Sequence, residues 1–181
     1  MAAERINIGN IDVVFLQLHC ERDRDKIAYY AKCLIEGQLD NFEKGATPWG
    51  NLECQDATDT ALLAIQHGTP CPEILGWLRY TTEIVAGLNI VFINGLATAK
   101  RKYKQTGRTL IEVLIMQTMW KQDIIEISPL SGVIEFYTKL EFQPLYPGGP
   151  YYRWISQTKE PTEELISAYR QDTIESEKKR E

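Results

Sequence analysis

The order of strand-like and helical segments predicts an α+β fold built around one central sheet. The patterns run strand, helix, several strands, helix, strand, helix and two strands, without internal repeats. The strongest strand, at 89–98, is apolar on both faces, which is typical of a strand buried on both sides. We expect one domain over 1–158, followed by a charged C-terminal helix or tail over 159–181.

Composition excludes several classes of protein. The chain has 181 residues and a net charge of −5, which argues against general nucleic-acid binding and suits a cationic or amine-bearing substrate. No apolar run reaches the ~20 residues that span a bilayer, and the N-terminus has no secretory signal pattern. The four cysteines form no CxxC pair, so we expect no metal site, free thiols and a cytoplasmic protein.

The first half of the chain alternates between apolar patterns and turn residues. Ile27, Ala31 and Leu34 recur at helical spacing, and Gly37 lies near the expected end of that helix. Strand-like runs flank a turn that contains Gly68, Pro70 and Pro72. In chain order we expect a strand at 6–18, a helix at 23–39, a loop at 41–55, and a hairpin of strands at 60–66 and 74–82.

The second half begins with the buried strand. Gly95 interrupts it and predicts a bulge or a close backbone approach. Ser128 and Pro129 suit the cap and first turn of a later helix. We expect a strand at 89–98, a basic loop at 100–107, a helix at 109–122, a strand at 123–127, a helix at 129–140, and strands at 142–145 and 151–156 around a turn at 147–150.

The basic loop and the start of the next helix form the first candidate site. Positive charge gathers there in an otherwise acidic chain, and Gly107 lies where the loop bends into the helix. A helix N-terminus offers unpaired N–H groups and the positive end of its dipole, which together favour a phosphate or diphosphate. A solvated basic turn is the alternative. The segment contains neither GxxxxGK[ST] nor GxGxxG. The cations are Lys100, Arg101, Lys102, Lys104 and Arg108.

The segment 132–142 forms the second candidate site. Val133, Tyr137 and Leu140 have helical spacing, which by itself makes Tyr137 a core or rim aromatic. The alternative is a proton donor, because a phenol with an unperturbed pKa near ~10 stays protonated at neutral pH.

In this order, the two segments resemble those of the GNAT N-acetyltransferases. The loop of that family reads Arg/Gln-x-x-Gly-x-Gly/Ala, and 104–109 matches it with Lys104 and Gly107, whereas Thr109 replaces the last small residue. The later segment of the family reads A-x-x-F-Y-x-x-x-G-F, and 133–142 fits it closely, with Glu141 where glycine is usual. The resemblance extends over roughly 61–154 and implies a mixed, mostly antiparallel central sheet flanked by helices.

The resemblance also implies a reaction, the transfer of an acetyl group from acetyl-coenzyme A directly to a primary amine within a ternary complex. Tyr137 would protonate the departing thiolate, and a base is needed for the amine. Glu83 is the candidate base, ahead of Glu126 and Asn94. The strand backbone at Leu96, Ala97 and Thr98 would hold the pantetheine arm, and the diphosphate would bind at Lys104, Gln105, Thr106, Gly107, Arg108 and Thr109.

Two other functions stay open at this point. The first is a non-catalytic domain of the same fold that binds an acyl-coenzyme A or a protein, since Thr109 and Glu141 depart from the family pattern. The second is a nucleic-acid module that uses the basic loop, which the acidic balance disfavours. The expected partners are acetyl-coenzyme A and an amine, small or protein-borne, with no nucleic acid and no membrane. The sequence does not reveal the oligomeric state, and a homodimer stays open.

Overall fold

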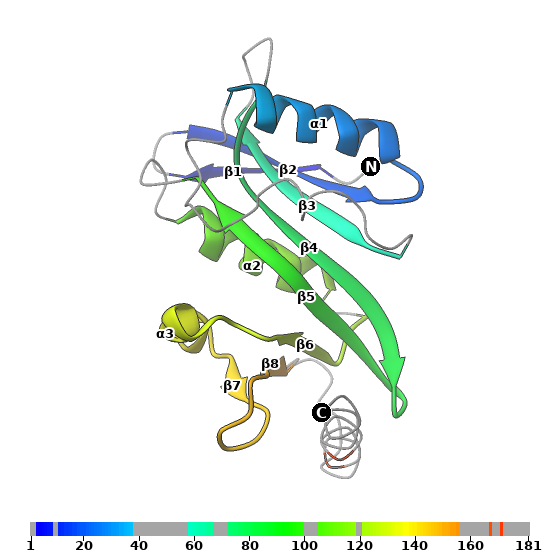
Figure 1. Cartoon of the computed structure of the whole chain (residues 1–181), viewed down its shortest axis with the longest axis vertical. Coiled ribbons are helices and arrows are strands. Elements are labelled where there is room, and N and C mark those ends of the chain that lie inside the picture. The colour runs from blue at the N-terminus through cyan, green and yellow to red at the C-terminus, as the bar shows by residue number, and fades with distance from the viewer. Residues whose placement is uncertain are drawn as a thin grey trace. The chain divides into compact units, whose positions relative to one another are not determined.

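The computed structural model describes residues 3–8, 11–37, 58–66, 72–99, 105–118, 121–155, 167 and 171. Eight strands form a sheet in the order β1-β2-β3-β4-β5-β6-β8-β7 (Figure 1). The pair β5–β6 is parallel, whereas β1–β2, β2–β3, β3–β4, β6–β8 and β7–β8 are antiparallel. The expected mixed, mostly antiparallel α+β sheet is therefore confirmed.

The strands are β1 Ala3–Ile8, β2 Ile11–His19, β3 Thr60–Gln66, β4 Glu73–Val85, β5 Leu88–Thr98, β6 Ile124–Ile127, β7 Gln143–Pro144 and β8 Tyr152–Ile155. The helices are α1 Arg24–Gly37, α2 Thr106–Thr118 and α3 Ile134–Thr138. None of the helices in the described part of the chain is long and apolar enough to cross a membrane.

The chain divides into two compact units, and strands β4 and β5 contribute to both. The first unit holds residues 1–81 and 94–116, and the second holds 82–93 and 117–181. The long β-hairpin of β4 and β5 therefore has its open end in the first unit and its turn in the second.

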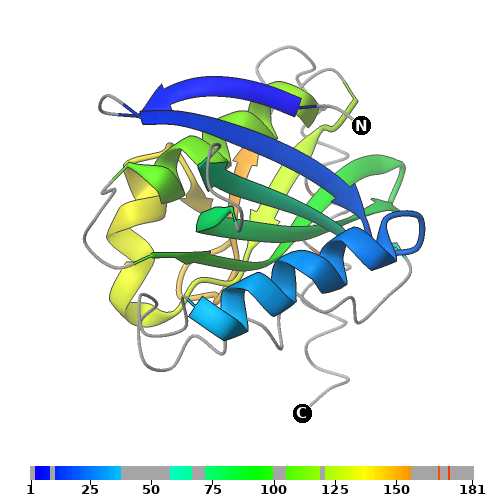
Figure 2. The same ribbon diagram turned by 90° about the horizontal axis from the view of Figure 1, so that it is seen from above.

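In the first unit, helices cover both faces of the sheet. Alternate residues of β4 point to opposite faces. Trp77 packs in a core cluster with Ile27 and Ala31 of α1, which lies across one face (Figure 2). The neighbouring Gly76 lies against Leu110 of α2. The apolar residues on the two faces of these strands are thus buried by one helix on each side, α1 and α2.

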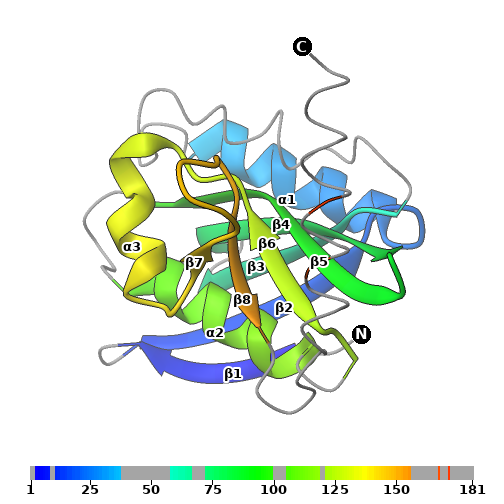
Figure 3. The same cartoon turned by 90° about the horizontal axis from the view of Figure 1, so that it is seen from below.

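The second unit is built on the parallel pair of β5 and β6, beside which β8 and β7 lie in turn (Figure 3). Leu88, Ile90, Ile124 and Leu145 form its core cluster. Strand β6 begins where Asp123 accepts hydrogen bonds from the backbone and side-chain N–H groups of Asn89, at 2.8 and 3.0 Å.

The strand expected at 6–18 is wrong, because two strands occupy this segment. β1 and β2 pair antiparallel from Ala3↔Leu16 to Ile8↔Ile11. The sequence between the last paired residues is Gly9-Asn10. A two-residue Gly-Asn connection is a recognised hairpin signal, and the apolar residues on both sides concealed it.

Other boundaries differ from expectation as well. α2 begins at Thr106 rather than at 109, so most of the glycine segment is its first turn. The helix expected at 129–140 is shorter, with a 3-10 turn at Ser131–Val133 and then α3. No side chain caps either piece, so the predicted cap at Ser128 is wrong. The expected loop at 41–55 and nearly all of the expected tail at 159–181 lie outside the described residues.

The expectation of free thiols is wrong for Cys20, which is disulfide-bonded. Its partner lies outside the described residues, and Cys33 is a buried free thiol. Spacing in the sequence could not reveal the bond, because a disulfide depends on the distance between two Cα atoms in space. Disulfides are rare in a reducing compartment, so Cys20 counts against the cysteine-based argument for the cytoplasm.

Asp23 fixes the start of helix α1. Its carbonyl oxygen accepts the backbone N–H of Ile27 at 3.0 Å, so Asp23 is the N-cap residue. Its carboxylate accepts hydrogen bonds from Lys26 Nζ at 3.1 Å and from the backbone N–H of His19 at 3.2 Å. These bonds, the one from Lys26 above all, lower the pKa of Asp23 from 3.8 to about 2.

We expect Asp23→Asn to destabilise the protein near neutral pH and to flatten its acid dependence of stability. As pH falls from about 4 to about 2, the unfolded chain takes up a proton at Asp23 before the folded protein does, so stability is lost in this window. Urea unfolding between pH 2.5 and 6 measures both effects. Asp25→Asn, an exposed neighbour, is the control and should keep the wild-type slope. Equal slopes for the wild type and Asp23→Asn would contradict this assignment.

Candidate active site

The N-terminus of helix α2 is the first component of the site. The N–H of Thr109 donates to the carbonyl oxygen of Gln105 at 2.9 Å, which is the first bond of the helix. The N–H groups of Gly107 and Arg108 come before it, where N–H groups point out of the end of a helix. Gly107 is half-buried and has no side chain over its backbone. The arrangement fits a diphosphate, because backbone donors and the helix dipole converge there.

Gly76 of β4 permits this helix start to lie close to the strands. A Cβ on Gly76 would lie 2.9 Å from the carbonyl oxygen of Ala97, 3.1 Å from Thr106 Cγ2 and 3.2 Å from Leu110 Cδ1. Real Cβ atoms do not come within 3.0 Å of a backbone atom, so only glycine fits between β5 and the first turn of α2. The sequence pattern gave Gly76 no special role within its strand, yet Gly76 positions the first turn of α2, which belongs to the predicted phosphate site.

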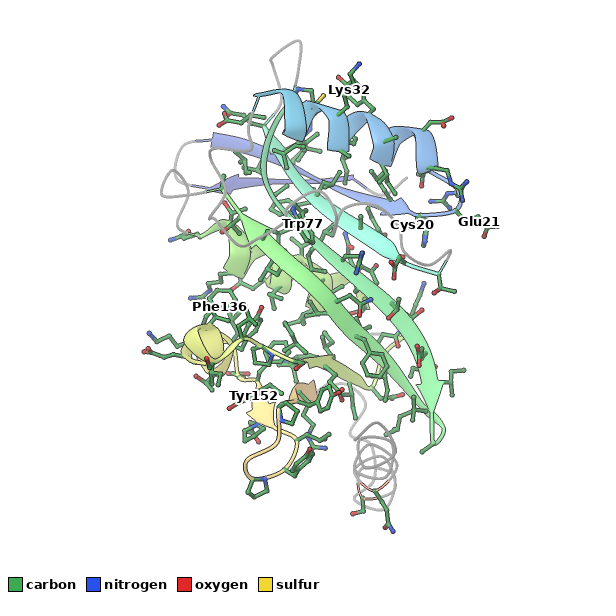
Figure 4. All side chains as sticks on the ribbon, in the orientation of Figure 1. Cys20, Glu21, Lys32, Trp77, Phe136 and Tyr152 are labelled. Carbon is green, nitrogen blue, oxygen red and sulfur yellow. The ribbon has the colours of Figure 1, made fainter. Side chains whose placement is uncertain are left out.

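Strand β5 supplies the second component. Its parallel ladder with β6 runs from Ile90↔Ile124 to Ile93↔Ile127, whereas β5 continues to Thr98. In the part of the chain that the structure describes, no β6 residue pairs with 94–98. The close approach expected at Gly95 is confirmed, since a Cβ added there would lie 3.0 Å from the ring of Trp77, a residue that Figure 4 labels.

The side chain of Arg108 is committed to a neighbour on its own helix. Its Nε lies 2.7 Å from Glu112 Oε1, an i,i+4 pair, and the arginine side chain is 63% exposed. Lys104, the other cation expected at the phosphate, lies outside the described residues. Of the basic residues predicted for the phosphate site, Arg108 is therefore the one that lies within the described residues.

Tyr137 is a buried residue of α3. Its ring makes edge contacts with Phe136, at 4.9 Å between centroids, and with Phe142, at 5.7 Å (Phe136 is labelled in Figure 4). Burial raises the pKa of Tyr137 to about 12. The phenol therefore stays protonated well beyond neutral pH.

Glu141 explains why the family pattern has glycine at its position. Its φ is 68°, in the left-handed region. The N–H of Phe142 donates to the carbonyl oxygen of Tyr137 at 3.1 Å, as where a helix ends in a left-handed residue. Glycine adopts this conformation freely, whereas other residues bear a cost of roughly 1–2 kcal/mol.

The structure groups the predicted residues in two sets. Leu96–Thr98 and Gln105–Thr109 belong to the first unit, and Tyr137 and Glu83 belong to the second. Glu83 is an exposed residue of β4. Glu126 is buried and lies opposite Arg153 in the register of β6 and β8. Within the described residues, no group of three or more His, Cys, Asp or Glu side chains could hold a metal ion.

A buried ion pair in the first unit escaped the sequence analysis. Arg79 Nε lies 3.5 Å from Asp59 Oδ2, and the two side chains are 7% and 3% exposed. The other oxygen, Oδ1, accepts a hydrogen bond from Asn94 Nδ2 at 3.4 Å. Asp59 comes just before β3, whereas Arg79 and Asn94 lie on β4 and β5, so no short sequence pattern predicts these contacts.

A surface hollow of about 630 Å³ lies in the second unit, beside α3. It contains none of the predicted site residues, although Phe142, which touches Tyr137, is part of its wall. Its lining residues are Thr138, Glu141, Phe142, Gln143, Pro144, Arg153 and Trp154.

Comparison with known proteins identifies the fold. No protein-family model and no curated protein matches the sequence. Tetrahymena GCN5 matches over 80% of this chain and 97% of its own, with a TM-score of 0.53 and 11% identity. The aminoglycoside 6′-N-acetyltransferase from Enterococcus faecium matches over 81% and 99%, with a TM-score of 0.52 and 13% identity. An aminoglycoside 6′-acetyltransferase of type Ii matches over 81% and 99%, with a TM-score of 0.53 and 14% identity.

The chain has the GNAT acetyltransferase fold. The strand and the helix that the resemblance singled out correspond to β5 and α2 of this structure. At these levels of identity the agreement concerns the fold, so the chemistry has to be argued from the residues of this chain.

We expect Gly76→Ala to destabilise the GNAT fold by about 1–3 kcal/mol, because the added methyl has to displace a backbone carbonyl or the first turn of α2. Urea unfolding measures the loss. Gly132→Ala is the matched control, since nothing lies within 4 Å of its added Cβ, and its effect should stay within about 0.5 kcal/mol. Two variants of equal stability would show that the approach at Gly76 does not constrain the fold.

Proposed function

We propose that this protein transfers an acetyl group from acetyl-coenzyme A to a primary amine within a ternary complex. The observation that carries the proposal is the combination, in one unit, of the stretch of β5 beyond its ladder with β6 and the helix start at half-buried Gly107 and exposed Arg108. The GNAT fold of the chain and the acetyltransferases that share it support this reaction.

The residues of the first unit would hold acetyl-coenzyme A by its two ends. Backbone groups of Leu96, Ala97 and Thr98 would pair with the amides of the pantetheine arm, as in the addition of a strand. Gln105 to Thr109 would receive the diphosphate at the helix N-terminus, with Lys104 adding charge. When bound, the co-substrate supplies a thioester whose carbonyl carbon accepts the amine.

The acceptor would be a molecule that carries positive charge in solution, and the amine that attacks would be in its neutral form. The net charge of −5 suits a positively charged molecule. Two of the structures with the same fold are named for aminoglycosides, which makes a polyamine of that class the first acceptor to test. In the reaction the nitrogen lone pair forms a C–N bond, the C–S bond breaks, one N–H proton goes to a base, and the thiolate takes up a proton.

Tyr137 would donate a hydrogen bond to the departing sulfur. A thiol of pKa about 8.5 and a phenol of pKa about 12 differ by about 3.5, so complete proton transfer to the thiolate costs on the order of 5 kcal/mol. The buried phenol therefore stabilises the developing charge as a donor, and the pool of solvent protons restores neutrality at the thiol.

Glu83 stays our candidate for the base that receives the amine proton. It is exposed, so it would act through solvent on a substrate that is already bound. The use of acetyl-coenzyme A, an intracellular metabolite, supports a cytoplasmic location, and the disulfide at Cys20 is the observation against it.

One observation favours a second function, the binding of an acyl-coenzyme A without turnover. The ion pair with Glu112 would compete with a ligand at the helix start for the Arg108 guanidinium. Thr109 replaces a small residue of the family pattern, and its hydroxyl donates back to the carbonyl oxygen of Gln105 at 3.0 Å. Product analysis with kanamycin, spermidine and a lysine peptide separates binding from transfer.

We expect Arg108→Gln to weaken acetyl-coenzyme A binding by about tenfold and to leave binding of S-acetylpantetheine, which lacks the diphosphate, unchanged. Titration calorimetry measures both ligands. Arg24→Gln, which removes an exposed arginine from the first turn of α1, is the matched control and should bind like the wild type. A parallel loss for both ligands would place the effect outside the diphosphate site.

We expect Tyr137→Phe to lower kcat by about 10²-fold and to leave the affinity for acetyl-coenzyme A within twofold, because the hydroxyl would act on the charge that develops at sulfur. Steady-state kinetics and calorimetry measure the two effects, and thermal unfolding checks that the buried ring still packs. Unchanged kcat would remove Tyr137 from the mechanism.

A further inference from the structure

The side chain of Asn94 is held in one orientation on strand β5. Its Nδ2 donates to Asp59 Oδ1 at 3.4 Å and to Thr81 Oγ1 at 3.3 Å, so both hydrogens of the amide are engaged. The opposite orientation would place the amide oxygen against a carboxylate oxygen, and two acceptors repel each other. The carbonyl oxygen Oδ1 of Asn94 is therefore directed away from Asp59.

The anchor behind Asn94 is rigid. Asp59 is 2% exposed, its second carboxylate oxygen pairs with buried Arg79 at 3.5 Å, and its carbonyl oxygen accepts the N–H of Cys20 at 2.9 Å. Asn94 itself is exposed. Donation of the amide to an anion polarises the group and makes the outward oxygen a stronger acceptor.

The contacts of Asn94 and Gly95 indicate a local irregularity in β5. Trp77, Arg79 and Thr81 lie on one face of β4, because alternate residues share a face. Asn94 contacts Thr81, and the neighbouring Gly95 faces the ring of Trp77. Two consecutive residues are thus directed to the same face, as in a β-bulge, which re-aims a side chain.

Asn94 lies on the course that the proposed co-substrate would take. It belongs to the same unit as the pantetheine and diphosphate residues. From Thr98, nearest to the helix start, Asn94 lies four residues back along the strand, or roughly 14 Å at 3.4 Å per residue. A pantetheine arm that runs from the helix start along Thr98, Ala97 and Leu96 carries its acyl end toward Asn94.

We propose that Asn94 Oδ1 accepts a hydrogen bond from the attacking primary amine and orients its lone pair toward the acyl carbon, with Asp59 and Thr81 as positioning residues. The inference rests on the acetyl transfer proposed above and adds the group that recognises the acceptor. An amide oxygen binds an N–H but does not remove its proton, so Asn94 holds the amine while the base receives the proton. The site selects acceptors that keep a free N–H to donate.

Kinetics with the best amine among kanamycin, spermidine and a lysine peptide test the proposal. In Asn94→Leu the KM for the amine should rise about tenfold, which corresponds to one hydrogen bond, with acetyl-coenzyme A affinity within twofold. The pH dependence of kcat should keep its wild-type midpoint, because Asn94 is not the base. Thr81→Val should raise KM two- to threefold, whereas Thr82→Val, exposed on the opposite face, should not.

Calorimetric titration of the same amine into protein saturated with coenzyme A separates this proposal from the proposed function. Weaker amine binding in Asn94→Leu, without acetyl transfer by the wild type, would support the amine site and contradict the transferase. Acetyl transfer by the wild type with an unchanged KM in Asn94→Leu would overturn the role of Asn94 and leave the transferase standing.

Discussion

The close approach of helix α2 to strands β4 and β5 is the constraint on which the candidate site depends. Gly76 leaves room for the carbonyl oxygen of Ala97 and the side chain of Thr106 at the same point. The first turn of the helix can therefore begin close to Ala97, near the end of β5. Without this contact the strand edge and the candidate anion site would be unrelated features.

Two kinds of hydrogen-bond donor would have different roles in the proposed reaction, one in binding the co-substrate and the other in the rate of transfer. Backbone donors at the helix start would act on a charge that is present before and after the reaction, so they would contribute to binding. The phenol of Tyr137 would act on a charge that appears only as the C–S bond breaks, so it contributes to rate. The amide nitrogen of Asn94 donates to Asp59 and Thr81, and its amide oxygen would accept a hydrogen bond from the incoming amine.

Periodicity and turn residues predicted most of the fold. The apolar runs at 60–66 and 89–98 and the helical spacing at Ile27 and Ala31 correspond closely to β3, β5 and α1. The predicted start of helix α2, at 109, was three residues too late. Thr106 and Gly107 are poor helix formers, and packing overrides their low propensity. The hairpin of β1 and β2 was missed because its apolar strands read as one run.

The candidate site could be predicted only where its chemistry is local in sequence. The helix start and Tyr137 belong to contiguous motifs, and Glu141 could be noticed as a departure without its left-handed backbone being known. The contacts of Asp59 with Arg79 and Asn94 join residues 20 and 35 positions apart, and Gly76 meets a helix about 30 residues later. Such contacts follow from the topology of the sheet, which no short pattern encodes.

The most direct measurement of the central claim is an NMR titration of ¹⁵N-labelled protein with coenzyme A. The account predicts that the backbone amide signals of Gly107 and Arg108 move downfield and gain protection from hydrogen exchange, because their N–H groups become donors to phosphate oxygens. Saturation by coenzyme A with these two signals unmoved would show that the ligand binds elsewhere and would contradict the account.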